Sequence, residues 1–222
     1  MPTGNRFLDS IPPVTRNLLY VNVILFVATL INPTVMKGLF SMAFPLSTSF
    51  RWWQPLTHMF MHDGFFHIFF NMYTLVMFGM VVERVLGTKK FIIFYLITGF
   101  GAVALHTAVE FWQVQQLLQQ YPGVAPQAIY NSVPGVLGAS GAVYGVLVAF
   151  AMLYPEARLT LIFPPITLDA KWWVLIFIGI ELLTGITGTQ MGVAHFAHLG
   201  GALFGWLLIR YWRKKGQLYK RW

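Results

Sequence analysis

Apolar residues fall into six long stretches along the chain, and each stretch ends at charged residues, proline or glycine. A helix needs roughly 17–25 mostly apolar residues to cross a bilayer. Several stretches are shorter than this, so we expect some tilted or short spans. The pattern predicts an all-α membrane protein in which six transmembrane helices form one bundle. The stretches cover approximately residues 17–31, 65–82, 91–111, 137–153, 172–186 and 195–212.

Two connections between these stretches are unusually long. Residues 32–64 are rich in Phe, Met and Trp, so we expect a long loop in the outer membrane interface, with Trp52 and Trp53 at the level of the lipid head groups. Residues 112–134 combine a run of glutamines with three prolines, and they predict a short polar helix followed by an irregular outer loop. No repeat or separate soluble segment is visible. We therefore expect a single domain, 1–222, with its core at about 17–212.

Composition supports a membrane location. Hydrophobic residues make up 57% of the chain and charged residues only 10%, whereas a soluble domain has about 25% charged residues. A net charge of +8 would suggest nucleic acid as a partner for a soluble protein. Here the basic residues lie at the ends of the apolar stretches, so we expect the lipid bilayer and no nucleic acid as the partner.

The distribution of Lys and Arg predicts the orientation. If the N-terminus is inside, 13 of the 15 basic side chains lie inside and only Lys37 and Arg51 lie outside. This asymmetry favours six spans with both termini in the cytoplasm. Residues 1–16 lack the short apolar core and cleavage site of a signal peptide, so the first span is expected to direct insertion. We expect a multi-pass protein of the cell membrane, in particular a bacterial inner membrane.

A serine and a histidine stand among small residues in two of the spans. Ser140 lies in Gly138-Ala139-Ser140-Gly141, and His198 lies in Ala197-His198-Leu199-Gly200-Gly201. The serine hydroxyl could bond back to its own helix, or His198 could take its proton and make it a nucleophile. The pairs Gly141/Gly145 and Gly201/Gly205 allow these two helices to approach closely. Spacing alone leaves both possibilities open.

Other polar residues in the spans are candidates for supporting roles, because polar groups in a bilayer are costly. His67 and Asn71 are four residues apart and share a helix face, where they could stabilise an oxyanion or join two helices. Tyr144 lies one turn after Ser140 and could pack under the ring of His198. His106 receives no role from the sequence, and Glu181 could bond a neighbouring helix or face a watery opening. His195 is expected at the outer end of its span, nearer water than His198.

Three histidines, His58, His62 and His67, raise the question of zinc. The chain has no cysteine and lacks the His-Glu-x-x-His pattern of helical metalloproteases. We expect no metal and no cofactor, and we expect His58 and His62 to tie the loop to neighbouring backbone.

Taken together, these motifs resemble the rhomboid family of intramembrane serine proteases. Gly138-Ala139-Ser140-Gly141 is similar to the family's GxSG motif, with Tyr144 at the companion tyrosine, and Ala197-His198 followed by Gly200-Gly201 is similar to its histidine motif. His67 to Asn71 matches the HxxxN motif, and Gly79-x-x-x-Glu83-x-x-x-Gly87 matches GxxxExxxG. The resemblance covers about Trp53 to Gly201.

The resemblance implies cleavage of the transmembrane segments of other proteins by a Ser-His dyad. Ser140 would be the nucleophile and His198 the base, with the Ser140 N–H, His67 and Asn71 as oxyanion donors and Tyr144, Gly138 and Gly141 in support. The family often has Trp-Arg where this chain has Trp53-Gln54, which leaves the geometry of the outer loop open. Two alternatives remain: a catalytically silent relative that binds client segments, and a small transporter that uses the same polar residues.

Overall fold

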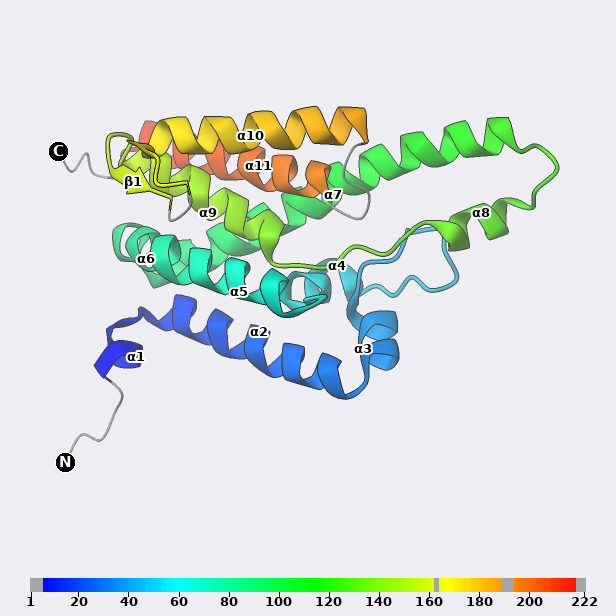
Figure 1. Ribbon diagram of the computed structural model, residues 1–222, viewed down its shortest axis with the longest axis horizontal. Helices are drawn as coiled ribbons and strands as arrows, with labels where there is room; N and C mark the ends of the chain where they lie inside the picture. Colours follow the sequence, from blue (N-terminus) through cyan, green and yellow to red (C-terminus); the bar gives the residue numbers. More distant parts are fainter. Residues whose placement is uncertain (1–5, 162–163, 189–193, 219–222) are drawn as a thin grey trace.

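The computed structural model describes residues 6–161, 164–188 and 194–218, and over these residues the chain forms a bundle of helices with one short hairpin (Figure 1). The elements, in chain order, are α1 Arg6–Ser10, α2 Pro13–Ile31, α3 Pro33–Phe40, α4 Gln54–Thr57, α5 Phe65–Thr74, α6 Met80–Leu86, α7 Thr88–Gln120, α8 Pro126–Ser132, α9 Ser140–Leu153, β1 Arg158–Thr160, β2 Thr167–Asp169, α10 Ala170–Thr187 and α11 His195–Lys214.

The predicted six-helix membrane bundle is confirmed. A π-helical turn, Leu75–Gly79, joins α5 to α6, so the chain runs as one helix of 22 residues from Phe65 to Leu86. This helix, α2, α7 and α10 are each long and apolar enough to cross a membrane. The remaining two long helices are α9, an apolar helix of 14 residues, and α11, with 20 residues.

Two predicted boundaries were wrong. The glutamine-rich segment is not a separate helix, because α7 continues without a break for 33 residues to Gln120. Gln and Leu favour helix and no breaker occurs before Pro122, so the helix has no reason to stop earlier. The connection that follows contains α8 and is not wholly irregular. The fourth helix begins at Ser140 instead of Leu137, because Gly138 has a φ of 135° that no helix accommodates.

The first and last long helices start and finish at one end of the bundle. Figure 1 shows α1, β1 and the end of α11 at the same end, as an even number of crossings requires. The turn between α6 and α7 lies there as well. Arg84 lies in the last turn of α6, and Lys89 and Lys90 lie in the first turn of α7. The basic residues thus gather at the end that the charge count assigned to the cytoplasm.

The long connection between α2 and α5 is held by the side chain of Gln54, which is fully buried. Its Oε1 accepts hydrogen bonds from the backbone N–H groups of Ala43 (3.2 Å) and Arg51 (3.1 Å). Its Nε2 donates to the carbonyl oxygens of Ser49 (3.1 Å) and Gly38 (3.4 Å). One amide therefore joins four points of the connection, including Gly38 in α3.

Glycines bring α9 and α11 into backbone contact. A Cβ placed on Gly201 would lie 1.8 Å from the carbonyl oxygen of Gly141, and one on Gly205 would lie 2.9 Å from Cα of Gly145. Any side chain at these positions would push the helices apart. The close approach expected from the spacing of these glycines is therefore present.

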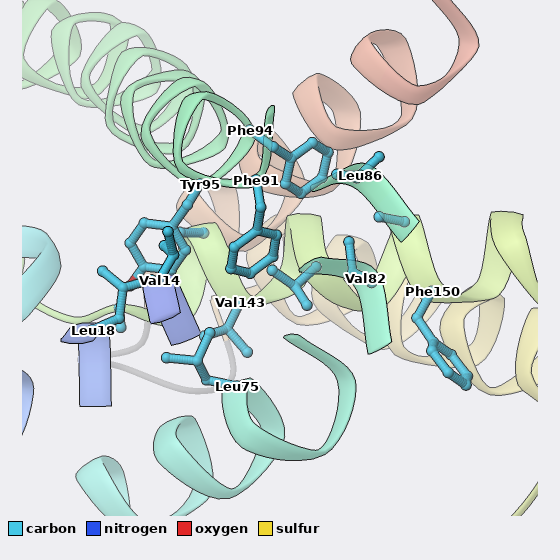
Figure 2. Packing of buried hydrophobic residues seen from close by; sticks show 14 of the residues in the cluster. Val14, Leu18, Leu75, Val82, Leu86, Phe91, Phe94, Tyr95, Val143 and Phe150 are labelled. Carbon is cyan, nitrogen blue, oxygen red and sulfur yellow. The ribbon is translucent and has the colours of Figure 1, made fainter. Parts of the chain in front are cut away.

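The main hydrophobic core lies between α2, the α5–α6 helix, α7 and α9, and it includes buried residues of α11 (Figure 2). Aromatic rings of α7 fill its centre, because Phe91, Phe94 and Tyr95 have no exposed surface. Leu75 and Val82 meet them from the neighbouring helix (Figure 2). This packing fixes the relative positions of the helices that carry the polar residues discussed below.

Glu83 is a buried carboxylate that caps the N-terminus of α2. Its two oxygens accept hydrogen bonds from the backbone N–H of Val14 (2.9 Å) and from the backbone N–H (2.7 Å) and hydroxyl (2.8 Å) of Thr15. The first N–H groups of a helix have no partner within the helix, and a negative charge there interacts favourably with the helix dipole. Glu83 therefore links α6 to α2 by satisfying these donors.

We predict that Glu83→Gln lowers the free energy of unfolding by roughly 1–3 kcal/mol, because the amide places N–H groups against buried donors. The thermal midpoint in detergent measures this change. Glu156→Gln, which alters an exposed carboxylate, is the control and should leave the midpoint unchanged. Equal midpoints for Glu83→Gln and the wild type would contradict the capping role.

Candidate active site

Ser140 and His198 meet at the crossing of α9 and α11. Ser140 is the first residue of α9 and His198 the fourth of α11, and Ser140 Oγ lies 2.7 Å from His198 Nε2. The glycine contacts described above bring the two helix starts together. A serine hydroxyl at hydrogen-bond distance from an imidazole is the arrangement in which the histidine can remove the serine proton.

Gly138 leaves space beside the serine. A Cβ at this position would lie 2.9 Å from His67 Nε2 and 3.5 Å from Ser140 Oγ, and the φ of 135° disfavours any side chain. Its N–H donates to the carbonyl oxygen of His58 at 2.9 Å, which anchors the turn before α9. The imidazole of His67 and the hydroxyl of Ser140 therefore face the same small space. Gly141 has a different constraint, because its Cβ would lie 2.4 Å from that of Ala102.

Tyr144 contacts the catalytic candidate His198 through its ring. The two rings are stacked, with centroids 4.5 Å apart and planes inclined by 8°. The phenol hydroxyl of Tyr144 donates a hydrogen bond of 2.6 Å to Glu181 Oε1. One side chain therefore restrains both the imidazole and a carboxylate on α10.

Glu181 lies on the far side of the His198 ring from Ser140. Its Oε1 is 2.9 Å from His198 Nδ1, although the oxygen lies off the ideal N–H direction. Catalytic hydrogen bonds are often poorly aligned without substrate and improve in the complex. The second oxygen, Oε2, is 2.6 Å from Nδ1 of His195.

The sequence predicted the surroundings of His195 wrongly and left those of Glu181 open. His195 does begin its helix, as expected, but the prediction that it lies nearer water than His198 is wrong, because it is only 6% exposed and pairs with Glu181. Of the two alternatives for Glu181, the structure shows a bond to neighbouring helices, and it brings the carboxylate to the expected Ser140–His198 pair. The available signal was a lone acid within an apolar span, which by itself indicates a functional group. Its partner was hidden because α10 and α11 are separate segments.

His67 and Asn71 stand on α5 at the wall of a cavity. Nδ1 of His67 accepts a hydrogen bond from the backbone N–H of Asp63 at 3.4 Å. The ring proton is then on Nε2, the nitrogen that lies beside Gly138. Asn71 Nδ2 donates to the carbonyl oxygen of His67 at 2.9 Å, which leaves one N–H of the amide. Both residues have a donor that could serve an oxyanion.

The cavity has a volume of about 780 Å³ and gives Ser140 and His198 access to space outside the bundle. It is lined by both apolar and polar side chains, including Phe66 and Phe70. On its α7 wall, His106, which had no evident partner in the sequence, lies 3.2 Å from Glu110. The cavity is large enough for a segment of peptide.

The remaining histidines are buried in the connection before α5. His58 Nδ1 lies 3.0 Å from the carbonyl oxygen of Gln54, whereas neither ring nitrogen of His62 has a hydrogen-bond partner among the described residues. Burial lowers the pKa of His58 to about 4 and that of His62 to about 3. Both rings are therefore neutral near pH 7. Among the described residues, no group of three His, Asp or Glu side chains is arranged to hold a metal ion.

Comparison with known proteins adds information that the geometry alone lacks. Residues 49–215 match the family model of the Rhomboid domain. The chain is 32% identical to rhomboid protease AarA of Providencia stuartii over 74% of this chain and 57% of AarA. It is 34% identical to the mitochondrial presenilin-associated rhomboid-like protein of Bos taurus, over 73% of this chain and 40% of the relative.

A similar level of identity extends to a fungal protein. Rhomboid protein 1 of Saccharomyces cerevisiae, which is mitochondrial, is 30% identical over 71% of this chain and 42% of its own length. The chain thus spans between two fifths and three fifths of the relatives named here.

Proposed function

This chain belongs to the rhomboid family, and we propose that it is an intramembrane serine endopeptidase that cleaves transmembrane or membrane-proximal segments of other membrane proteins. The observation that carries the proposal is the distance of 2.7 Å between Ser140 Oγ and His198 Nε2 at the wall of an accessible cavity. A family relative, AarA, is named a protease.

In the proposed reaction, His198 Nε2 takes the proton of Ser140 as Oγ attacks the carbonyl carbon of the substrate. The negative charge that develops on the carbonyl oxygen is stabilised by the Ser140 N–H, His67 and Asn71. His198 then gives the proton to the leaving amine, and the acyl group remains on Ser140. Water that enters through the cavity hydrolyses this ester with His198 again as the base.

The alternative is a relative that binds client segments without cutting them. Such a protein has no need of a serine hydroxyl and an imidazole nitrogen at hydrogen-bond distance within a membrane bundle, where polar groups are costly. The stacked Tyr144 ring restrains His198 further. These features favour the protease, and covalent labelling separates the two.

We predict that Ser140→Ala and His198→Ala each abolish proteolysis, and that the double variant is no worse than either single one, because the two residues act as a unit. Cleavage of a panel of tagged transmembrane segments and labelling by a fluorophosphonate measure the effect. Melting temperature and elution volume are the controls for folding. Substantial cleavage by purified Ser140→Ala would remove Ser140 as the nucleophile.

We also predict that Asn71→Ala lowers kcat without abolishing labelling, and that His67→Ala costs at least as much. Loss of one oxyanion donor costs roughly 10²–10³ in kcat in a soluble protease, and the remaining donors should reduce this loss. Single-turnover rates beside melting temperatures test the role. An unchanged rate with a lowered melting temperature would assign both residues to helix contacts alone.

The proposed orientation places both termini in the cytoplasm and α8 on the outer side of a cell membrane, which we take to be a bacterial inner membrane. Because the chain has no cysteine, single cysteines can be introduced without background. We predict that a cysteine at the exposed Gln115 reacts with an impermeant maleimide from outside and that one at the exposed Lys214 does not. If the cysteine at Lys214 reacts from outside and the one at Gln115 does not, the protein has the opposite orientation in the membrane.

A further inference from the structure

The carboxylate of Glu181 and the hydroxyl of Ser140 lie at the two nitrogens of the same imidazole. Ser140 Oγ is 2.7 Å from Nε2 of His198, and Glu181 Oε1 is 2.9 Å from Nδ1. We propose that Glu181 is a positioning residue that completes a Ser140–His198–Glu181 arrangement, so that the site does not work as a dyad. This inference rests on the proposed function.

The chemistry of the imidazole requires a defined tautomer. His198 can take the serine proton only if Nε2 carries none, and then the ring hydrogen is on Nδ1. An ionised carboxylate only accepts hydrogen bonds, so Glu181 at Nδ1 favours this tautomer. When Nε2 gains the proton of Ser140, the same carboxylate is the counter-ion of the imidazolium. Such an interaction is stronger for buried groups than in bulk water, and Glu181 is only 8% exposed.

Two other groups contact the carboxylate, and a third contacts one of these groups. The Tyr144 hydroxyl donates to Oε1 at 2.6 Å, and Nδ1 of His195 lies 2.6 Å from Oε2. Thr184 Oγ1, one turn along α10, lies 3.1 Å from the same nitrogen of His195. The carboxylate is therefore oriented by side chains of α9 and α11, as a positioning group requires.

A purely structural role would explain only part of this geometry. The contact between Glu181 and His195 is sufficient to tie α10 to α11, and it does not need Oε1 at Nδ1 of His198. Glu181 is 8% exposed and is not among the residues that line the cavity. It therefore acts on the reaction only through His198, and its loss should change the rate of the chemical step more than the binding of a substrate.

The test is the second-order rate of fluorophosphonate labelling of the purified full-length chain. In this reaction Ser140 Oγ attacks phosphorus, fluoride leaves and the serine proton passes to His198 Nε2, so the rate reports the base. We predict that Glu181→Gln lowers the rate roughly 10²–10⁴-fold, because the amide allows the wrong tautomer. Glu181→Asp keeps the charge, so it should be labelled at least about ten times faster than Glu181→Gln.

The matched control is Glu83→Gln, which changes another buried carboxylate far from the site. It should lower the melting temperature and leave labelling per folded molecule unchanged, whereas Glu181→Gln should lower labelling per folded molecule even where its own melting temperature also falls. When labelling is measured over a range of probe concentrations, Glu181→Gln should lower the labelling rate at saturating probe. The probe concentration that gives half of this rate should stay the same. If Glu181→Gln does not fold, Tyr144→Phe provides the test, because it keeps the stack and removes one bond to the carboxylate; its maximal rate should fall.

The outcomes separate this inference from the proposed function. If the wild type is labelled, Ser140→Ala is not, and Glu181→Gln is labelled at the wild-type rate per folded molecule, the positioning role is overturned and the protease remains. Equal rates for Glu181→Gln and Glu181→Asp, or for Tyr144→Phe and the wild type where that variant is used, also overturn it. If the wild type and Ser140→Ala are equally unlabelled, the proposed function itself fails.

Discussion

Backbone contact between α9 and α11 is the constraint on which the site depends. Lipid gives little hydrophobic drive for helices to associate, so close packing of small residues has to supply the attraction. Gly141 and Gly201 leave no space for a methyl group between their backbones. Because Ser140 precedes one of these glycines and His198 stands one turn before the other, the contact that stabilises the bundle also sets the Ser140–His198 distance.

Local patterns allowed much of this to be predicted. Hydropathy located the six helices, and the spacing of the glycines located the helix crossing. The contact between Glu181 and His198 had no such signal, because it depends on the rotation of α10 about its own axis relative to α11. The prediction for His195 failed because a residue at the end of an apolar stretch can face either water or a neighbouring helix. The predicted end of α7 failed because a polar, glutamine-rich sequence can continue a helix.

The hydrogen-bond partners of two buried carboxylates indicate which one has a structural role and which one supports catalysis. Glu83 accepts two backbone N–H groups and a hydroxyl at the start of α2, and these partners change little in any reaction. Glu181 faces two imidazoles and a phenol, and one of these imidazoles is the proposed base. The burial of the two acids is similar, so burial alone does not identify the acid that supports catalysis.

Gln54 shows how a departure from a family motif can be accommodated. Its amide accepts from the N–H groups of Ala43 and Arg51 and donates to the carbonyls of Ser49 and Gly38. An arginine can only donate, so it could not satisfy the two N–H groups. The loop of this chain is therefore organised by a group that both accepts and donates. The glutamine therefore orders the loop by contacts that an arginine could not make.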